Sequence, residues 1–263
     1  SRVLGSRFKE MGKEFLEKIR KLNWVLSEST TGKLSYAELS KMLSEVINTN
    51  FYVIDRHGFV LGGAYTEASD KSTFEDELGF EKITDSDNLG LLQIEKTEAN
   101  LIGRDLIPFF GKDYGMMDKY HTFVPAVCGG KRLGTILLAK YHKPFTDEEI
   151  VLAEYAAAVV GLEIQRNLQR ELENEKKLEM AVDMAFCTLS HSEKDALDRI
   201  LREMMEDEGT IVASKIAAKY GLTNSVIVSA LKKLESAGIL ETKSLGMKGT
   251  YIKILNPHVR SLI

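Results

Sequence analysis

Residues 210–255 read TIVASKIAAKYGLTNSVIVSALKKLESAGILETKSLGMKGTYIKIL, and this stretch decides the fold of the C-terminal part of the chain. It predicts a helix over Val212–Tyr220 that ends at Gly221, because glycine favours the positive φ of a helix terminus. A second helix is predicted over Asn224–Ala237, where apolar residues recur at helical spacing. Two helices joined by so short a turn are typical of a helix-turn-helix.

Two short strands are predicted after the second helix, over Ile239–Thr242 and Gly249–Ile254, because apolar and polar residues alternate there. The loop between them is rich in glycine and lysine, as expected of a wing that contacts phosphate. Thr223 or Ser225 is expected to cap the start of the second helix with its hydroxyl. The whole stretch therefore predicts a winged helix-turn-helix, a fold that reads DNA.

Positive charge is concentrated in this stretch, although the chain as a whole has a net charge of −4. Lysine contacts to phosphate supply the sequence-independent part of DNA affinity, and short polar side chains near the start of a recognition helix read base edges. We therefore expect this region to bind double-stranded DNA; a basic protein-docking module is the alternative. The candidate DNA-binding residues are Ser214, Lys215, Thr223, Asn224, Ser225, Ser229, Lys232, Lys233, Lys243 and Lys248.

A length of 263 residues with 44% hydrophobic content favours two domains over one. The sequence has no apolar run long enough to span a bilayer, and its first residues are charged rather than signal-like, so we expect a cytoplasmic protein without a membrane segment. The two cysteines, Cys128 and Cys187, are far apart in sequence. This predicts no disulfide framework, with a redox-sensing pair as the alternative.

The sequence contains no HExxH, CxxC, Walker A or nucleophile-elbow pattern, and its five histidines are scattered. Residues 128–135, CGGKRLGT, lack the spacing of a phosphate-binding loop. A β-hairpin turn is therefore favoured there. We expect no metal site, no cofactor and no enzymatic activity.

The N-terminal part is predicted to be an antiparallel sheet with helices. Amphipathic helices are expected over residues 8–27 and Tyr36–Ile47, and strand hairpins over Phe51–Gly62 and Tyr120–Tyr141. The middle segment, residues 63–118, is the least regular, and such segments are usually functional or mobile. This pattern is typical of sensor domains of the PAS and GAF type, which bind small molecules between the sheet and the variable loops.

A long helix is predicted from a cap at Thr146 to about Phe186, followed by a further helix from Ser192. Its apolar residues recur at helical spacing, which favours a dimerisation seam; a solvated single helix is the alternative. The expected domains are a sensor domain at 1–145, a helical linker at 146–190 and a DNA-binding domain at 191–263.

Several blocks of the sequence resemble the CodY family, nutrient-sensing repressors of low-GC Gram-positive bacteria. The resemblance covers nearly the whole chain from about Leu16. The blocks that carry it are VASKIA at 212–217, SVIV at 225–228, LESAG at 234–238, SLGMKGTYIK at 244–253 and GGKRLGT at 129–135.

The resemblance implies an α+β homodimer with an N-terminal GAF-like sensor domain, a long connecting helix and a C-terminal winged helix-turn-helix. The sensor domain of such proteins binds isoleucine, leucine or valine, and many of them also respond to GTP. Effector-bound dimers bind A/T-rich inverted repeats and repress genes for amino-acid uptake and synthesis.

Two segments depart from the family's pattern. Relatives grip the amino-acid carboxylate with an arginine after the first hairpin, whereas residues 71–77 here read KSTFEDE and leave Lys71 and Arg104 as the nearest cations. The turn associated with GTP keeps its charge only at Arg56. A front domain that serves as a dimerisation module with a lost or altered ligand is therefore a second hypothesis. The candidate effector-binding residues are Phe74, Phe80, Arg104, Ile107, Pro108, Phe109 and Phe110, and the phenylalanines can equally be plain core.

Overall fold

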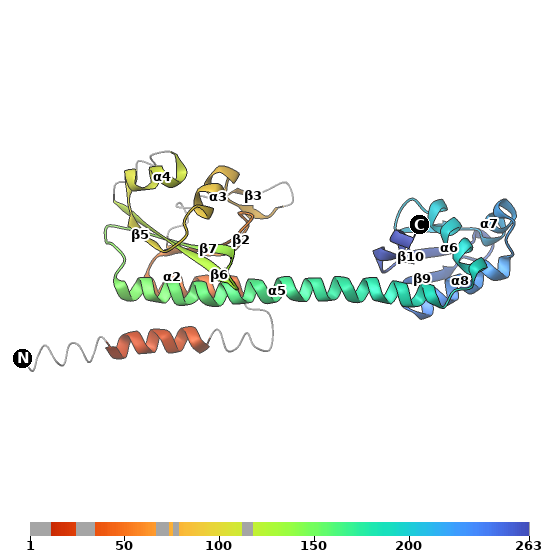
Figure 1. Ribbon diagram of the computed structural model, residues 1–263, viewed down its shortest axis with the longest axis horizontal. Coiled ribbons are helices and arrows are strands. Elements are labelled where there is room, and N and C mark those ends of the chain that lie inside the picture. The colour runs from red at the N-terminus through yellow and green to blue at the C-terminus, as the bar shows by residue number, and fades with distance from the viewer. Residues whose placement is uncertain (1–11, 25–34, 67–73, 76–78, 112–117, 263) are drawn as a thin grey trace, which may run out of the picture. The chain divides into compact units, whose positions relative to one another are not determined.

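The computed structural model describes residues 12–24, 35–66, 74–75, 79–111 and 118–262. The chain divides into two compact units, Ser1–Asn167 (the first unit) and Leu168–Ile263 (the second unit). One continuous helix, α5 (Asp147–Cys187), begins in the first unit and ends in the second (Figure 1). None of the described helices is long and apolar enough to cross a membrane.

The first unit is built on a five-stranded antiparallel sheet of strand order β2-β1-β7-β6-β5. Its strands are β1 (Asn50–Asp55), β2 (Val60–Ala64), β5 (Glu98–Leu101), β6 (Lys119–Cys128) and β7 (Lys131–Tyr141). Strand β1 pairs along its whole length with β7, with Phe51 opposite Leu138 and Asp55 opposite Gly134. Both predicted hairpins, β1–β2 and β6–β7, are confirmed.

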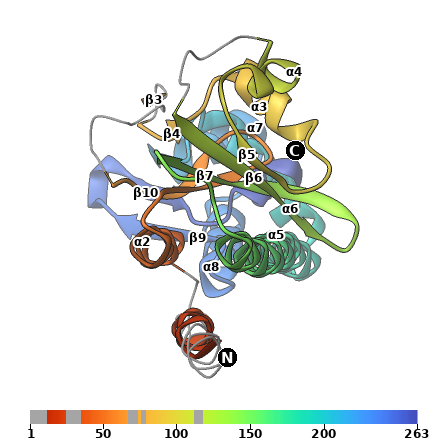
Figure 2. The same cartoon turned by 90° about the vertical axis from the view of Figure 1, so that its left-hand side faces the viewer.

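Helices cover both faces of this sheet, as the end-on view shows (Figure 2). Helices α2 (Tyr36–Ile47) and α5 lie on one face, and α3 (Asp85–Leu92) and α4 (Ile107–Phe110) lie on the other. Successive residues of a strand point to opposite faces. Phe51 and Val53 therefore join the core under α2 and α5, whereas Tyr52 and Ile54 join the core under α3. All four are buried because both faces are covered.

The N-terminal helix is described over residues 12–24. Its one buried side chain, Leu22, packs into the core shared with α2 and α5, and Phe15 and Ile19 lie partly buried beside it. Helix α2 begins at the cap Ser35, whose hydroxyl accepts a hydrogen bond from Glu38 N at 3.2 Å. The predicted amphipathic character of both helices is therefore confirmed for the described residues.

The middle of the first unit is more regular than the sequence predicts. It contains the short strands β3 (Phe74–Glu75) and β4 (Glu81–Lys82), helix α3, strand β5, a 3-10 turn η3 (Gly103–Leu106) and helix α4. Helix α3 buries only Asn88, Gly90 and Leu91 among its eight residues. It therefore carries no apolar stripe from which sequence periodicity could identify it.

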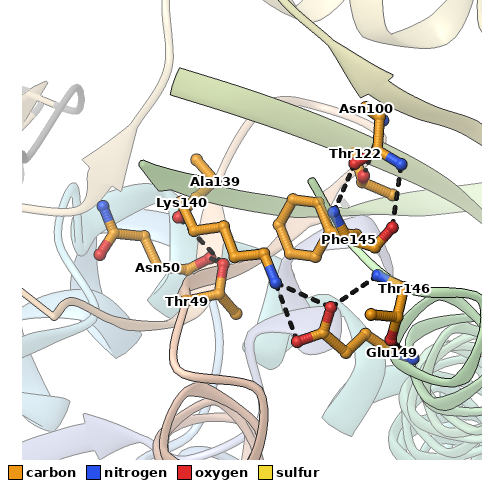
Figure 3. Close-up of polar contacts among 9 residues, drawn as sticks. All are labelled: Thr49, Asn50, Asn100, Thr122, Ala139, Lys140, Phe145, Thr146 and Glu149. Atoms are coloured by element: carbon orange, nitrogen blue, oxygen red, sulfur yellow. Dashed lines mark hydrogen bonds and ion pairs between the residues drawn. The ribbon is translucent and has the colours of Figure 1, made fainter. Parts of the chain in front are cut away.

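Helix α5 begins at a capping box, as predicted. Thr146 N donates to Glu149 Oε2 at 2.7 Å, and Glu149 N donates to Thr146 Oγ1 at 3.3 Å. The same carboxylate accepts two hydrogen bonds from Lys140 Nζ, at 2.8 and 2.7 Å (Figure 3). The start of the helix is thereby joined to strand β7.

The second unit contains three helices and a three-stranded sheet of order β8-β10-β9. Its helices are α6 (His191–Glu203), α7 (Ala213–Tyr220) and α8 (Asn224–Ser236), with short 3-10 turns η4 (Gly246–Lys248) and η5 (Pro257–Leu262). Its strands are β8 (Glu208–Ile211), β9 (Leu240–Ser244) and β10 (Thr250–Ile254). The predicted helix-turn-helix and two-stranded wing are confirmed, whereas β8 was not predicted.

Two predictions about helix starts are wrong. Helix α6 is capped by Ser190 rather than Ser192, because the Ser190 hydroxyl accepts from Glu193 N at 3.3 Å. Helix α8 is preceded by Thr223, but this hydroxyl lies 3.0 Å from the Ser225 hydroxyl and caps no backbone amide. The last turns of α5 belong to the core of this unit, through Val182 and Ala185.

Candidate functional site

Helix α8 separates into a buried side and an exposed side. Ile227, Ala230, Leu231 and Leu234 are buried in the core of the second unit. The exposed residues of the helix include Asn224, Ser225, Val228 and Lys232. Short polar groups near the start of the helix and a lysine further along provide for base-edge and phosphate contacts respectively.

Helix α7 and the wing after α8 present further predicted residues. Ser214 and Lys215 are exposed in the first turn of α7, and Lys243 and Lys248 are exposed on the wing between β9 and β10. The wing is shaped by Gly249, whose φ is +108° and whose Cα lies against the Ile211 carbonyl. A side chain at that position would collide with the backbone of β8.

Two of the predicted DNA-binding residues lie elsewhere. Ser229 Oγ donates to Glu193 Oε1 at 2.7 Å, and Lys233 Nζ donates to Glu193 Oε2 at 2.7 Å. Both side chains therefore contact helix α6 within the unit, while Lys232 and Ser225 face outward. An open groove of about 920 Å³ runs between the end of α5 and α8, with Met184 on one wall and Val228 and Lys232 on the other.

Other basic residues of this unit are engaged in ion pairs. Lys219 Nζ lies 2.5 Å from Glu203 Oε1, and Arg260 Nε lies 2.9 Å from Asp207 Oδ1. The Lys219 ammonium, with the Tyr220 hydroxyl, holds the pKa of the Glu203 carboxyl below its usual range. The basic field of the region is thus carried by Lys215, Lys232, Lys243 and Lys248 and by the similarly exposed Lys253.

A cavity of about 110 Å³ lies in the first unit between the sheet and helices α3 and α4. We call it the sheet cavity. Its size is comparable to the roughly 150 Å³ apolar cavity that accommodates a benzene molecule. Apolar side chains make up most of its wall: Ile54, Ile83, Leu91, Leu106, Phe110, Phe123 and Leu137.

Three polar side chains also line the sheet cavity: Lys119 and His121 from β6, and Asp87 from α3. Lys119, His121 and Phe123 alternate along β6 and therefore share the face of the sheet that α3 and α4 cover. Lys119 is only 3% exposed, which is rare for a lysine. A cation, an imidazole and a carboxylate thus meet inside a largely apolar cavity.

Arg132 supports the wall of this cavity from the neighbouring strand β7. Its guanidinium donates to the Leu91 carbonyl at 3.2 Å, to the Ile94 carbonyl and to Thr135 Oγ1 at 2.8 Å. Leu91 and Ile94 lie at and just beyond the end of α3, and the Leu91 carbonyl also accepts a hydrogen bond from Ile94 N at 3.1 Å. Partial burial lowers the pKa of this guanidinium.

Comparison with known proteins places both units in one family. The profile of the CodY GAF-like domain matches residues 14–188, and that of the CodY helix-turn-helix domain matches residues 207–261. The chain belongs to the CodY family. Its N-terminal domain is therefore GAF-like, and its C-terminal domain is the helix-turn-helix of a transcriptional regulator, as the sequence predicts.

Similar CodY proteins span nearly the same length. The global transcriptional regulator CodY of Clostridium acetobutylicum is 44% identical over 243 residues, which are 92% of this chain and 94% of that protein. CodY of Clostridium tetani is 43% identical with the same coverage. A solved structure, that of the cofactor-binding GAF domain of the nutrient sensor CodY from Clostridium difficile, is 39% identical, covers 57% of this chain and 96% of that one, and gives a TM-score of 0.48.

The effector-binding residues that the CodY resemblance predicts do not all line the sheet cavity. Phe110 lines the sheet cavity, and Phe109 packs beside it with ring centroids 6.4 Å apart. Arg104, Ile107 and Pro108 are exposed on η3 and α4 and are not among the lining residues. Phe80 is 60% exposed, and the side chain of Phe74 is outside the described part of the structure.

The turn for which the sequence predicts a nucleotide contact lies between β1 and β2. The Asp55 carboxylate accepts hydrogen bonds from His57 N at 2.8 Å and Phe59 N at 2.9 Å, which shapes the turn. Arg56 is exposed there, and its Nε donates to His57 Nε2 at 3.1 Å. A nucleotide contact at Arg56 stays a prediction.

Sequence reasoning did not single out Lys119, His121 or Asp87. The available signal was the alternation of Lys119, His121 and Phe123 at the start of a strand, where a lysine on the covered face is unusual. This alternation can be interpreted only when it is known which face of the sheet the helices cover. Within the described residues, no group of three His, Cys, Asp or Glu side chains is placed to hold a metal ion.

Proposed function

We propose that this protein is a ligand-responsive transcriptional repressor whose affinity for operator DNA rises when a branched-chain amino acid binds in the sheet cavity. The observation that carries the proposal is the nearly buried Lys119, which lines a largely apolar cavity together with His121 and Asp87. A free amino acid presents a carboxylate, an ammonium group and a side chain, and the cavity lining contains a complement for each of them.

Charge and polarity match each group of the amino acid to residues that line the sheet cavity. The ligand carboxylate would contact Lys119 and His121, because a carboxylate removed from water requires a cation or other donors. The ligand ammonium would contact the carboxylate of Asp87, which lines the same cavity. The aliphatic side chain of isoleucine, leucine or valine would lie among the apolar residues, including Phe110 and Leu106. Lys119 thus supplies a cation in place of the arginine that residues 71–77 lack.

The DNA partner proposed is an A/T-rich inverted repeat bound by a homodimer. A two-fold dimer presents two identical recognition helices to two half-sites of opposite orientation. The proposed contacts are Asn224, Ser225 and Lys232 on α8, with Ser214 and Lys215 on α7 and with Thr223, Lys243 and Lys248 around them. Within α5, Val151, Tyr155 and Leu162 are large apolar side chains that are 38–47% exposed, which supports a dimer seam there.

The chain is proposed to work as a sensor domain at 1–145, a linker and dimerisation helix at 146–190 and a DNA-binding domain at 191–263. Helix α5 is continuous from Asp147 to Cys187 and so joins the first unit to the second. A ligand changes DNA affinity only if its own affinity differs between the DNA-competent and the incompetent arrangement. A regulator of this kind acts where the chromosome is, in the cytoplasm of a bacterium.

Calorimetric titration of the full chain with isoleucine, leucine and valine tests the ligand. We expect saturable binding of at least one of them by the wild type, loss of that binding in Lys119→Met, and no change in Arg104→Ala. Arg104 is a suitable control because it is an exposed cation on the same side of the sheet. Melting curves of each variant, recorded alongside, check that the first unit stays folded.

Three results would contradict parts of the proposal. Loss of binding in Arg104→Ala but not in Lys119→Met would assign the carboxylate to Arg104. Absence of heat with all three amino acids would favour a front domain that serves as a dimerisation module. Binding that leaves the affinity for an A/T-rich duplex unchanged would separate ligand binding from DNA control.

A further inference from the structure

The start of helix α6 contains a capping box that extends beyond its own helix. Ser190 N donates to Glu193 Oε2 at 2.7 Å, and Glu193 N donates to Ser190 Oγ at 3.3 Å. These two bonds are all that a capping box requires. The carboxylate nevertheless accepts two further hydrogen bonds, both from helix α8.

The two donors on α8 lie one turn apart. Ser229 Oγ lies 2.7 Å from Glu193 Oε1, and Lys233 Nζ lies 2.7 Å from Glu193 Oε2. Residues four apart on a helix point the same way, so Ser229 and Lys233 hold the carboxylate together. The side chain of Glu193 is only 8% exposed, whereas that of Lys233 is 41% exposed.

The Lys233 ammonium also reaches the end of α5. It donates to the Thr188 carbonyl at 3.2 Å, and the Thr188 hydroxyl donates to the Ala185 carbonyl at 2.7 Å. Ala185 is in the last turn of α5 and is buried in the core of the second unit. One ammonium group therefore joins three segments: the end of α5, the start of α6 and the last turn of α8.

Electrostatic attraction and hydrogen bonds hold Lys233 at the Glu193 carboxylate. The hydrogen bonds from Lys233, then from Ser229 and the Ser190 amide, lower the pKa of Glu193 to about 2. The carboxylate is therefore ionised at neutral pH. If Lys233 left for a DNA phosphate, a nearly buried carboxylate would lose its counter-ion, which is unfavourable. Lys232, the next residue on the helix, is exposed and faces outward.

We infer that Glu193 is a positioning residue for DNA binding, which fixes the recognition helix α8 to α6 and to the end of α5 through Ser229 and Lys233. Lys233 consequently contacts no DNA phosphate, whereas its neighbour Lys232 does. This inference goes beyond the proposed function and requires only that the second unit binds DNA. Its outcome is independent of the ligand.

The adjacent lysines provide a matched pair of variants for the full chain. Lys232→Met and Lys233→Met are compared for binding to one A/T-rich duplex over a series of salt concentrations. Each phosphate contact that is lost reduces the slope of log K against log salt by about 0.9. We expect this reduction for Lys232→Met with an unchanged melting midpoint, and an unchanged slope with a lower midpoint for Lys233→Met.

A reduction of about 0.9 in the slope for Lys233→Met would place that lysine on a phosphate and overturn the inference. Three further variants keep the test decisive if Lys233→Met folds poorly. Lys233→Arg retains a donor for Glu193 and is expected to restore both the midpoint and the DNA affinity. Glu193→Gln and Lys233→Met should each lower the midpoint, and the double variant should lower it by less than their sum; strict additivity would also overturn the inference.

Discussion

Asn100 and Phe145 exchange two hydrogen bonds: Phe145 N donates to Asn100 Oδ1 at 2.6 Å, and Asn100 Nδ2 donates to the Phe145 carbonyl at 3.0 Å. Asn100 lies in the edge strand β5, and Phe145 lies just before α5 (Figure 3). The edge of the sheet is therefore fixed to the start of the long helix. Leu106 follows β5 closely in the chain and lines the sheet cavity. The hydrogen bonds between Asn100 and Phe145 therefore connect the segment that leads to the cavity with the start of α5.

Replacing Asn100 should destabilise the first unit. Asn100→Ala leaves two backbone groups of Phe145 without partners and places alanine at a φ of +61°. We expect a loss of about 2–4 kcal/mol in the free energy of unfolding. Urea unfolding followed by the fluorescence of Trp24, the single tryptophan, measures it. Asn100→Gly removes the hydrogen bonds without the conformational cost and should lose less; equal losses would show that the φ contributes nothing.

Arg132 is expected to be a structural residue of the cavity wall. Arg132→Met removes the guanidinium hydrogen bonds to the Ile94 carbonyl and to the Leu91 carbonyl, which keeps Ile94 N as a donor, and should cost about 1–3 kcal/mol. The amino-acid affinity should fall with it, because α3 forms one side of the cavity. Lys131→Met, an exposed neighbour, is the control and should leave both quantities unchanged. Trp24 fluorescence and calorimetry report the two effects, and equal effects of both variants would contradict the assignment.

Helices α3 and α4 meet at Gly90 without room for a side chain. A Cβ at Gly90 would collide with the Phe109 carbonyl and the Phe110 ring. Gly90→Ala should therefore separate the two helices, at a cost of about 1–3 kcal/mol, and weaken amino-acid binding. Gly12→Ala is the matched substitution, because no atom of the described residues lies within 4 Å of a Cβ there. A Gly90→Ala protein with wild-type affinity would show that the contact is dispensable for the cavity.

Acid should destabilise the second unit through Glu193. Its pKa is lowered to about 2 in the folded state by Lys233, Ser229 and the Ser190 amide. A depressed carboxyl pKa stabilises the fold above the unfolded value of about 4.3, and this contribution is lost as pH falls from there towards 2. Melting of the full chain from about pH 5 to about pH 3, which covers the upper part of that window, should show a steeper decline for wild type than for Glu193→Gln. Glu206→Gln, on an exposed residue, should follow the wild-type curve.

The elements with a strong repeating pattern could be predicted from the sequence. Helix α8 and helix α5 carry apolar residues at helical spacing, and the two hairpins alternate around glycine turns. Strand β8 could not be predicted, because Glu208–Ile211 is short and is a strand only by pairing with β10. Helix α3 could not be predicted either, since its buried residues include Asn88 and Gly90 rather than an apolar stripe.

The residues of the candidate sites also divide into those that the sequence predicts and those that only the packing of the chain brings together. The exposed residues of the recognition helix follow from its periodicity, because the side opposite a buried stripe faces solvent. Ser229 and Lys233 are the exceptions, and only packing of α8 on α6 brings them to Glu193. Of the expected effector residues, Phe110 lines the sheet cavity, but the sequence could not distinguish it from the exposed Ile107 and Arg104.

By itself, the sequence determined the class of each domain, the continuous helix between them and the DNA-reading character of the C-terminal one. These depend on local periodicity, turn residues and charge, which are properties of neighbouring residues in the chain. Only the tertiary structure decided that Lys119, His121 and Asp87 share one cavity and that Lys233 serves the fold. Those pairings join residues far apart in sequence, and what a lysine contacts depends on which segments fold around it.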